Sequence, residues 1–313
     1  MTKLKWHPSL EKTFKGCEIW WQSGMIKENR REAMSALLSK SLSEEGRFKL
    51  HPSALMVLAQ TYSTEACLLG AKNEADALAR PLRNGVQFRA LDFMKVATRS
   101  LPGDDSQPLL PFKSSLMAVG PTMLSDWTLG RLCAYYLIQV AHKDMRMNVP
   151  EIRKEGWGKG TNDAFLIALL SQAYGIETHY ASAKPMIEVY RRLLEVWRGT
   201  DQDVFRAAMA EAAEFHISRS KGSTDRIWYE FDSYYDSVYP SELLAVQALR
   251  QRDGLPEFEV GHLLIDTPWS IIRDLAEGES HSLAIALEKR LRGDDHDFWS
   301  VLESSSVAGE DSG

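Results

Sequence analysis

The chain has 313 residues, of which 44% are apolar and 26% are charged, so it can bury one large core or two ordinary ones. Its 37 Lys and Arg residues against 43 Asp and Glu residues give a net charge of −6. This acidity argues against direct nucleic-acid binding, which needs a basic face, and it suits a partner that is itself basic. A modest net charge also serves ordinary solubility, so the partner's charge stays open at this point.

The cysteines and the apolar runs indicate a protein of the cytoplasm. Cys17, Cys67 and Cys133 are odd in number and far apart, which predicts neither a disulfide framework nor a zinc site. The first 16 residues carry charges throughout and lack the apolar stretch of a signal peptide. The most apolar run, residues 129–141, is too short to span a bilayer, so we expect no membrane segment.

Helical periodicity recurs along the chain, and the first half predicts four elements. Residues 53–71, 86–100 and 124–144 have the pattern of helices, and the last has an apolar face broad enough for a central position in the core. Residues 109–119, between two proline-containing turns, are the one place where a short extended piece or β-hairpin is expected.

The second half predicts a helical hairpin flanked by two further helices. A helix opens at Thr161 or Asn162 and ends at Gly175. Residues 186–197 and 203–220 form two helices joined by a short link in which Thr200 and Asp201 are suited to the N-cap. Ser241 is expected to cap the helix that follows, and Gly254 is expected to end it.

These elements predict an all-α fold in a single domain over residues 1–313. It is either a multi-helix bundle or an array of helical hairpins, with at most one short β-hairpin. Residues 1–80 supply N-terminal helices and residues 81–292 the main helical core. Residues 293–313 form an acidic tail that is expected to be partly disordered.

No sequence motif predicts a catalytic residue, a cofactor site or a metal site. GWGKGT at 156–161 separates the lysine and threonine that a P-loop needs side by side, and GESHS at 278–282 lacks the closing glycine of a nucleophile elbow. His216 lies two residues from Glu214 and five from Glu211, so the three do not share a helix face and a packed histidine is expected. GDDHD at 293–297 lacks the spacing of a calcium loop.

Residues 227–240, IWYEFDSYYDSVYP, interleave aromatic and acidic side chains. Tyr and Trp are typical of interface hot spots, and neighbouring carboxylates suit a basic partner. In the alternative, the aromatic rings fill the core beneath a loop and the carboxylates point outward. The residues predicted to bind a partner are Trp228, Tyr229, Glu230, Asp232, Tyr235 and Asp236.

The apolar pattern of residues 80–270 resembles the immunity-protein-49 family of bacterial polymorphic toxin systems. The resemblance is strongest from Ile187 to Trp269, and the N-terminal 80 residues lie outside it. The residues that carry it are Gly120, Pro121, Trp127, Ala134, Asp144, Leu194, Trp197, Asp201, Phe205, His216, Pro240, Leu243, Leu244, Ala245, Leu249, Leu263 and Leu264.

The resemblance implies a mostly helical antidote that binds its cognate toxin, occludes the toxin's active site and is not itself an enzyme. Because the N-terminus shows no export signal, the toxin is expected to be one that acts in the cytosol. Two alternatives remain open. A helical-repeat scaffold or regulator is consistent with the paired helices, and an enzyme can assemble its site from residues far apart in the sequence.

The partner-binding hypothesis predicts that replacing both Trp228 and Tyr229 by alanine weakens toxin binding while leaving the fold intact. Binding of the double variant is measured against the unchanged chain, and circular dichroism monitors the fold. A double variant that unfolds would place these rings in the core instead.

Overall fold

The computed structural model describes residues 4–42, 52–101, 114–147, 160–224, 227, 229–275 and 279–294. All regular structure in these ranges is helical, which confirms the all-α prediction. In chain order the elements are η1 (Pro8–Leu10), α1 (Glu11–Gln22), α2 (Met25–Ala36), η2 (Leu37–Ser41), α3 (Pro52–Ala71), α4 (Ala75–Ser100), α5 (Ser114–Met123), α6 (Trp127–Met147), α8 (Asn162–Tyr174), α9 (Glu188–Val196), α10 (Gln202–Arg219), α11 (Tyr234–Val238), α12 (Ser241–Arg252), α13 (Leu263–Ile272) and α14 (Ser282–Asp294).

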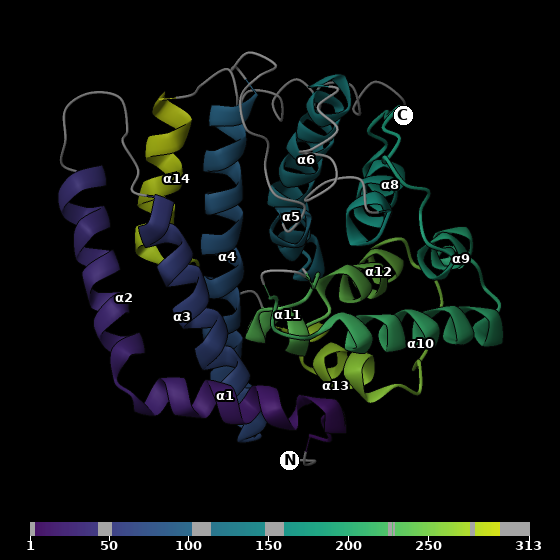
Figure 1. Cartoon of the computed structure of the whole chain (residues 1–313), viewed down its shortest axis with the longest axis horizontal. Helices are drawn as coiled ribbons and strands as arrows, with labels where there is room; N and C mark the ends of the chain where they lie inside the picture. Colours follow the sequence, from purple (N-terminus) through teal and green to yellow (C-terminus); the bar gives the residue numbers. More distant parts are fainter. Residues whose placement is uncertain are drawn as a thin grey trace.

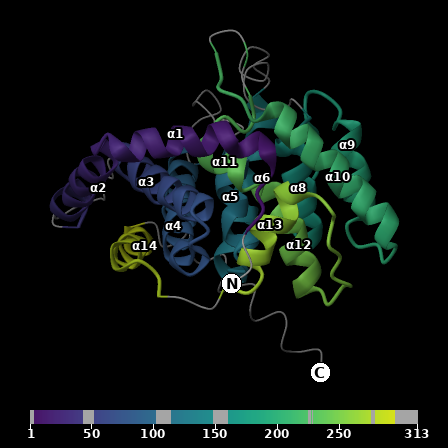
Figure 2. The ribbon, with the colours of Figure 1, turned by 90° about the horizontal axis from the view of Figure 1, so that it is seen from below.

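The helices run in two main directions. In Figure 1, α2, α3, α4 and α14 run along one direction on one side of the molecule, while α1 and α10 run across them. Helix α3 packs along α4, and α5 packs against α4, α6 and α12. Seen from below in Figure 2, α1 lies across one side of the bundle, with α2 at its outer end. This crossing arrangement is a bundle, and not a regular array of equivalent hairpins.

A single core joins all parts of the described chain. Its buried apolar side chains extend from Leu10 to Leu291 in one connected cluster. Helix α4 runs through the expected boundary between residues 80 and 81, and α3 packs along it. The N-terminal helices therefore share the core of the later helices.

Two predicted elements differ from the structure. From Ser114 onward the expected extended piece is the helix α5, and its first five residues lie outside the described ranges. Almost every residue of α5 is buried, so its sequence has no polar face, and a short apolar run of this kind cannot be told from a strand by periodicity. The helix expected from residue 86 begins at Ala75 and continues through Pro81.

Local signals at helix ends were more informative. Asp201 is the N-cap of α10, where its side chain accepts hydrogen bonds from the backbone N–H groups of Asp203 and Val204. Gly175 ends α8 with a φ of 63°, the left-handed conformation that glycine adopts most easily. The predicted cap at Ser241 is wrong, because Pro240 occupies the N-cap and the Ser241 hydroxyl donates to the Tyr239 carbonyl.

Helix α12 is buried from Ser241 to Arg250 and carries a charged side chain near each end. Glu242 lies in the first turn, where the positive end of the helix dipole favours a carboxylate. Arg250 lies in the last turn and donates to the carbonyls of Trp197, Gly199 and Pro256 at 2.5, 3.0 and 2.8 Å. It thereby fixes the turn between α9 and α10 against the centre of the molecule.

We predict that Arg250→Met strongly destabilises the fold. The substitution leaves the carbonyls of Trp197, Gly199 and Pro256 without their donor, and each buried acceptor that stays unsatisfied costs about 1–3 kcal/mol. Arg191→Met is the control, because Arg191 is half exposed and solvent screens its ion pairs with Glu188 and Glu195, so that its loss should be small. Urea unfolding measures both variants, and equal losses would contradict the role assigned to Arg250.

Candidate functional site

The predicted partner-binding segment, residues 227–240, is largely folded into the core. Glu230, Tyr235 and Asp236 are only 2%, 4% and 7% exposed. Tyr229 and Asp232 are partly buried, and Trp228 lies outside the described residues. The structure therefore does not present these side chains together as one exposed aromatic and acidic surface.

Asp236 is held by a local cap and by a distant arginine. Ser233 is the N-cap of α11, and its hydroxyl donates to Asp236 Oδ2 at 2.6 Å while accepting from the Asp236 backbone N–H. Arg89 on α4 donates to Asp236 Oδ1 at 2.7 Å and lies over the Tyr235 ring. Burial has the largest single effect and lowers the pKa of Arg89. The charge and hydrogen bond of Asp236, with Tyr235 and Asp92, together outweigh burial, so that this pKa lies above its usual value.

Glu230 also has a cationic partner within the chain. Its Oε2 accepts from Arg219 Nε at 2.5 Å, and the Arg219 guanidinium lies over the Tyr229 ring. Two of the three carboxylates expected to face a basic partner, Glu230 and Asp236, thus face arginines of α10 and α4. The alternative prediction, in which the rings fill the core and the carboxylates point outward, holds only in part. Glu230 and Asp236 are buried together with the aromatic rings.

His216 is the packed histidine that the sequence predicts. It is fully buried, stacks on Phe231 with ring centroids 3.8 Å apart, and places Nδ1 2.6 Å from Glu242 Oε1. Its Nε2 lies 2.8 Å from the Asp236 carbonyl, so this nitrogen carries a proton. The short contact to Glu242 needs a second proton, on the ring or on the carboxyl group. Since His216 and Glu242 have no solvent exposure, their pair holds the core together and offers no access to a substrate.

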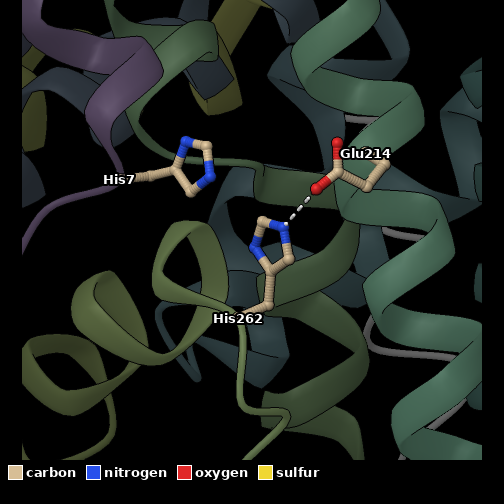
Figure 3. A group of neighbouring side chains, drawn as sticks. All are labelled: His7, Glu214 and His262. Atoms are coloured by element: carbon tan, nitrogen blue, oxygen red, sulfur yellow. Dashed lines mark hydrogen bonds and ion pairs between the residues drawn. The ribbon is translucent and has the colours of Figure 1, made fainter.

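Glu214 instead belongs to a cluster with two other histidines, which we call the two-histidine cluster. Figure 3 shows His7 before η1, Glu214 on α10 and His262 just before α13, with their side chains directed toward one another. One ligand atom from each lies within 4.8 Å of the other two. His262 Nε2 lies 3.1 Å from Glu214 Oε1, and the His7 and His262 rings stack 9° from parallel.

The electrostatics of the two-histidine cluster favour the neutral form of the His7 imidazole. Burial lowers the pKa of His7, and the nearby His262 lowers it further, while the Glu214 carboxylate acts in the opposite direction. Sequence patterns gave no sign of this cluster, because its members come from three elements far apart in the chain.

An open hollow lies along one face of α2 and its continuation η2, and we call it the α2 groove. It has a volume of about 640 Å³. Its lining recurs at helical spacing and consists of Lys27, Arg30, Arg31, Met34, Ser35, Leu38 and Ser39. Leu38 is 53% exposed, so the groove combines an accessible apolar floor with three cationic side chains.

The three cationic side chains of the α2 groove differ in how firmly other residues hold them. Arg30 is fixed to α3, where it pairs with Glu65 at 2.7 Å and lies 4.0 Å from the Tyr62 ring centroid. Lys27 and Arg31 are exposed. Lys27 lies 5.7 Å from the Trp21 ring centroid, and Arg31 makes a long contact of 3.6 Å to Glu28. These two side chains are therefore available to carboxylates of another molecule.

Comparison of the chain with protein families, with curated proteins and with solved structures finds no match. Within the described part of the chain, no helix is both long enough and apolar enough to cross a membrane.

We predict that Asp236→Ala destabilises the fold by about 3–5 kcal/mol, because it leaves the Arg89 charge buried without its partner. Asp76→Ala is the matched control, since Asp76 also lies in the first turn of a helix but is exposed. Its loss should stay within about 0.3–1 kcal/mol. Chemical denaturation of both variants tests this prediction. If Asp236→Ala were as stable as the unchanged chain, Asp236 would not be a buried partner of Arg89 but a surface residue.

Proposed function

We propose that this chain is an immunity-type protein that neutralises a toxin by binding it directly and does no chemistry of its own. The resemblance of residues 80–270 supports this class of function. The observation that carries the proposal is the α2 groove, an open hollow with an apolar floor and cationic sides. Such a combination suits the contact of another protein, in which apolar anchors provide affinity and charges provide orientation.

The position of α2 supports the same function. Helix α2 packs against α1 and α3, and it lies at the outer end of the bundle in Figure 1 and Figure 2. Met34 on α2 and Leu38 on η2, which continues it, occupy successive turns of the groove face. Methionine adapts to irregular partner surfaces, and an exposed leucine beside it extends the apolar contact. A partner can therefore dock here without disturbing the core.

The charge of the α2 groove is opposite to the net charge of the chain. The chain as a whole, at −6, favours encounter with a basic toxin that acts in the cytosol. Lys27 and Arg31 favour carboxylates at the point of contact. The toxin segment that enters the groove is thus expected to carry acidic and apolar side chains, whatever the charge of the rest of the toxin.

Binding through the α2 groove also separates this proposal from the alternative of a helical-repeat scaffold. A repeat protein stacks equivalent helix pairs, so that a concave surface extends along the whole array. Here the α3–α4 and α9–α10 pairs are neighbours in sequence, but α1 and α10 run across the direction of α3 and α4. The crossing directions favour a compact antidote over a scaffold.

Co-expression with the toxin encoded beside its gene tests the function itself. We expect the chain to form a stable complex with the C-terminal domain of that toxin and to restore growth of cells that express it. Absence of both the complex and the rescue would overturn the proposal.

We predict that the double substitution Lys27→Glu with Arg31→Glu weakens toxin binding at least about 10-fold, because close charge pairs across an interface contribute about 1.5 kcal/mol or more. Calorimetric titration measures the change. The control is Lys12→Glu with Lys72→Glu, which changes the net charge equally at exposed positions outside the groove. Equal weakening by both pairs would indicate long-range charge effects and remove the groove from the interface.

A further inference from the structure

The two-histidine cluster has the composition of a binding site for a divalent transition metal ion. Zinc in proteins is bound by imidazole nitrogens and carboxylate oxygens at about 2.0–2.2 Å in a tetrahedral arrangement. His7, Glu214 and His262 offer two nitrogens and one oxygen, which leaves a fourth position for water. The three ligands come from the segment before η1, from α10 and from the residue before α13.

The spacing of the ligand atoms is close to what such an ion requires. Tetrahedral bonds of this length place neighbouring ligand atoms about 3.3 Å apart. Glu214 Oε1 and His262 Nε2 are already 3.1 Å apart, and all three atoms lie within 4.8 Å. Glu214 is 69% exposed and can rotate freely, whereas His262 is 12% exposed and is the fixed member.

The other ring nitrogens are directed away from the centre of the cluster. His7 Nδ1 lies 2.8 Å from the Ser9 hydroxyl and receives the Ser9 backbone N–H in a long bond of 3.3 Å. With Nε2 as the ligand, Nδ1 carries the proton, donates a hydrogen bond to the Ser9 hydroxyl and gives up the bond from the Ser9 N–H. His262 Nδ1 receives the Leu264 backbone N–H in a long bond of 3.3 Å. When His262 Nε2 binds a metal ion, Nδ1 carries the ring proton and can no longer accept the weak bond from Leu264. Because the two rings are stacked almost parallel, one of them must rotate before both Nε2 atoms point at the same ion. We expect the His7 ring, on the N-terminal segment, to be the one that rotates.

We propose that His7, Glu214 and His262 bind one divalent ion of the zinc class. The ion would tie the segment before η1 to α10 and to the start of α13. It would therefore act as a structural clamp on the N-terminal segment. This inference is independent of the α2 groove, which lies on another helix.

Binding of Zn²⁺ to the full chain, first treated with a chelator and then dialysed, tests the proposal. Isothermal titration with ZnCl₂ should give one equivalent of bound ion and a rise in the thermal unfolding temperature. MgCl₂ should give neither, because magnesium prefers oxygen ligands. His7→Gln, Glu214→Gln and His262→Gln should each weaken Zn²⁺ binding at least 10-fold.

The chain supplies a matched control in its second stacked histidine pair, His142 and His179, whose ring centroids are 4.1 Å apart. Among the described residues this pair belongs to no three-ligand group, so His179→Gln should leave Zn²⁺ binding unchanged. Circular dichroism verifies the fold of each variant, and Glu214→Gln is the decisive one because its exposed position leaves the fold undisturbed. Absence of Zn²⁺ binding, or binding that Glu214→Gln leaves intact, would overturn the proposal.

Discussion

The structure depends on a helix that is buried on every side yet carries a charge near each end. Helix α12 sits among α5, α8, α10 and α13, and its charged residues Glu242 and Arg250 have almost no access to solvent. Glu242 meets His216 and Tyr190, and Arg250 meets the carbonyls around the α9–α10 turn. A buried charge without a partner is very unfavourable, so these contacts constrain how the surrounding helices are placed.

This constraint explains why the aromatic and acidic segment before α12 turns inward. His216 bonds both Glu242 and the carbonyl of Asp236, so the chain entering α12 is drawn against α10. Once the segment lies there, Arg89 pairs with Asp236 and Arg219 pairs with Glu230. These buried groups therefore serve to hold the fold, and the α2 groove and the two-histidine cluster are the candidate sites that the described residues leave for function.

The sequence predicted what is decided locally. Asp201 and Gly175 mark helix ends by interactions within a few residues, and their pattern identified α10 and α8 correctly. The burial of Asp236 depends on Arg89, which is 147 residues away, and no local pattern reveals it. The two-histidine cluster escaped prediction for the same reason, because His7 and His262 meet only after the chain has folded.

Hydrogen exchange of the free and toxin-bound chain tests the account most directly. If α12 holds the core together and the toxin binds in the α2 groove, amides of residues 25–39 should gain protection in the complex. Amides of α12 should exchange most slowly in both states, and those of residues 229–240 should not change. Protection gained at residues 229–240, with none on α2, would contradict the account and place the interface on the segment that the sequence first suggested.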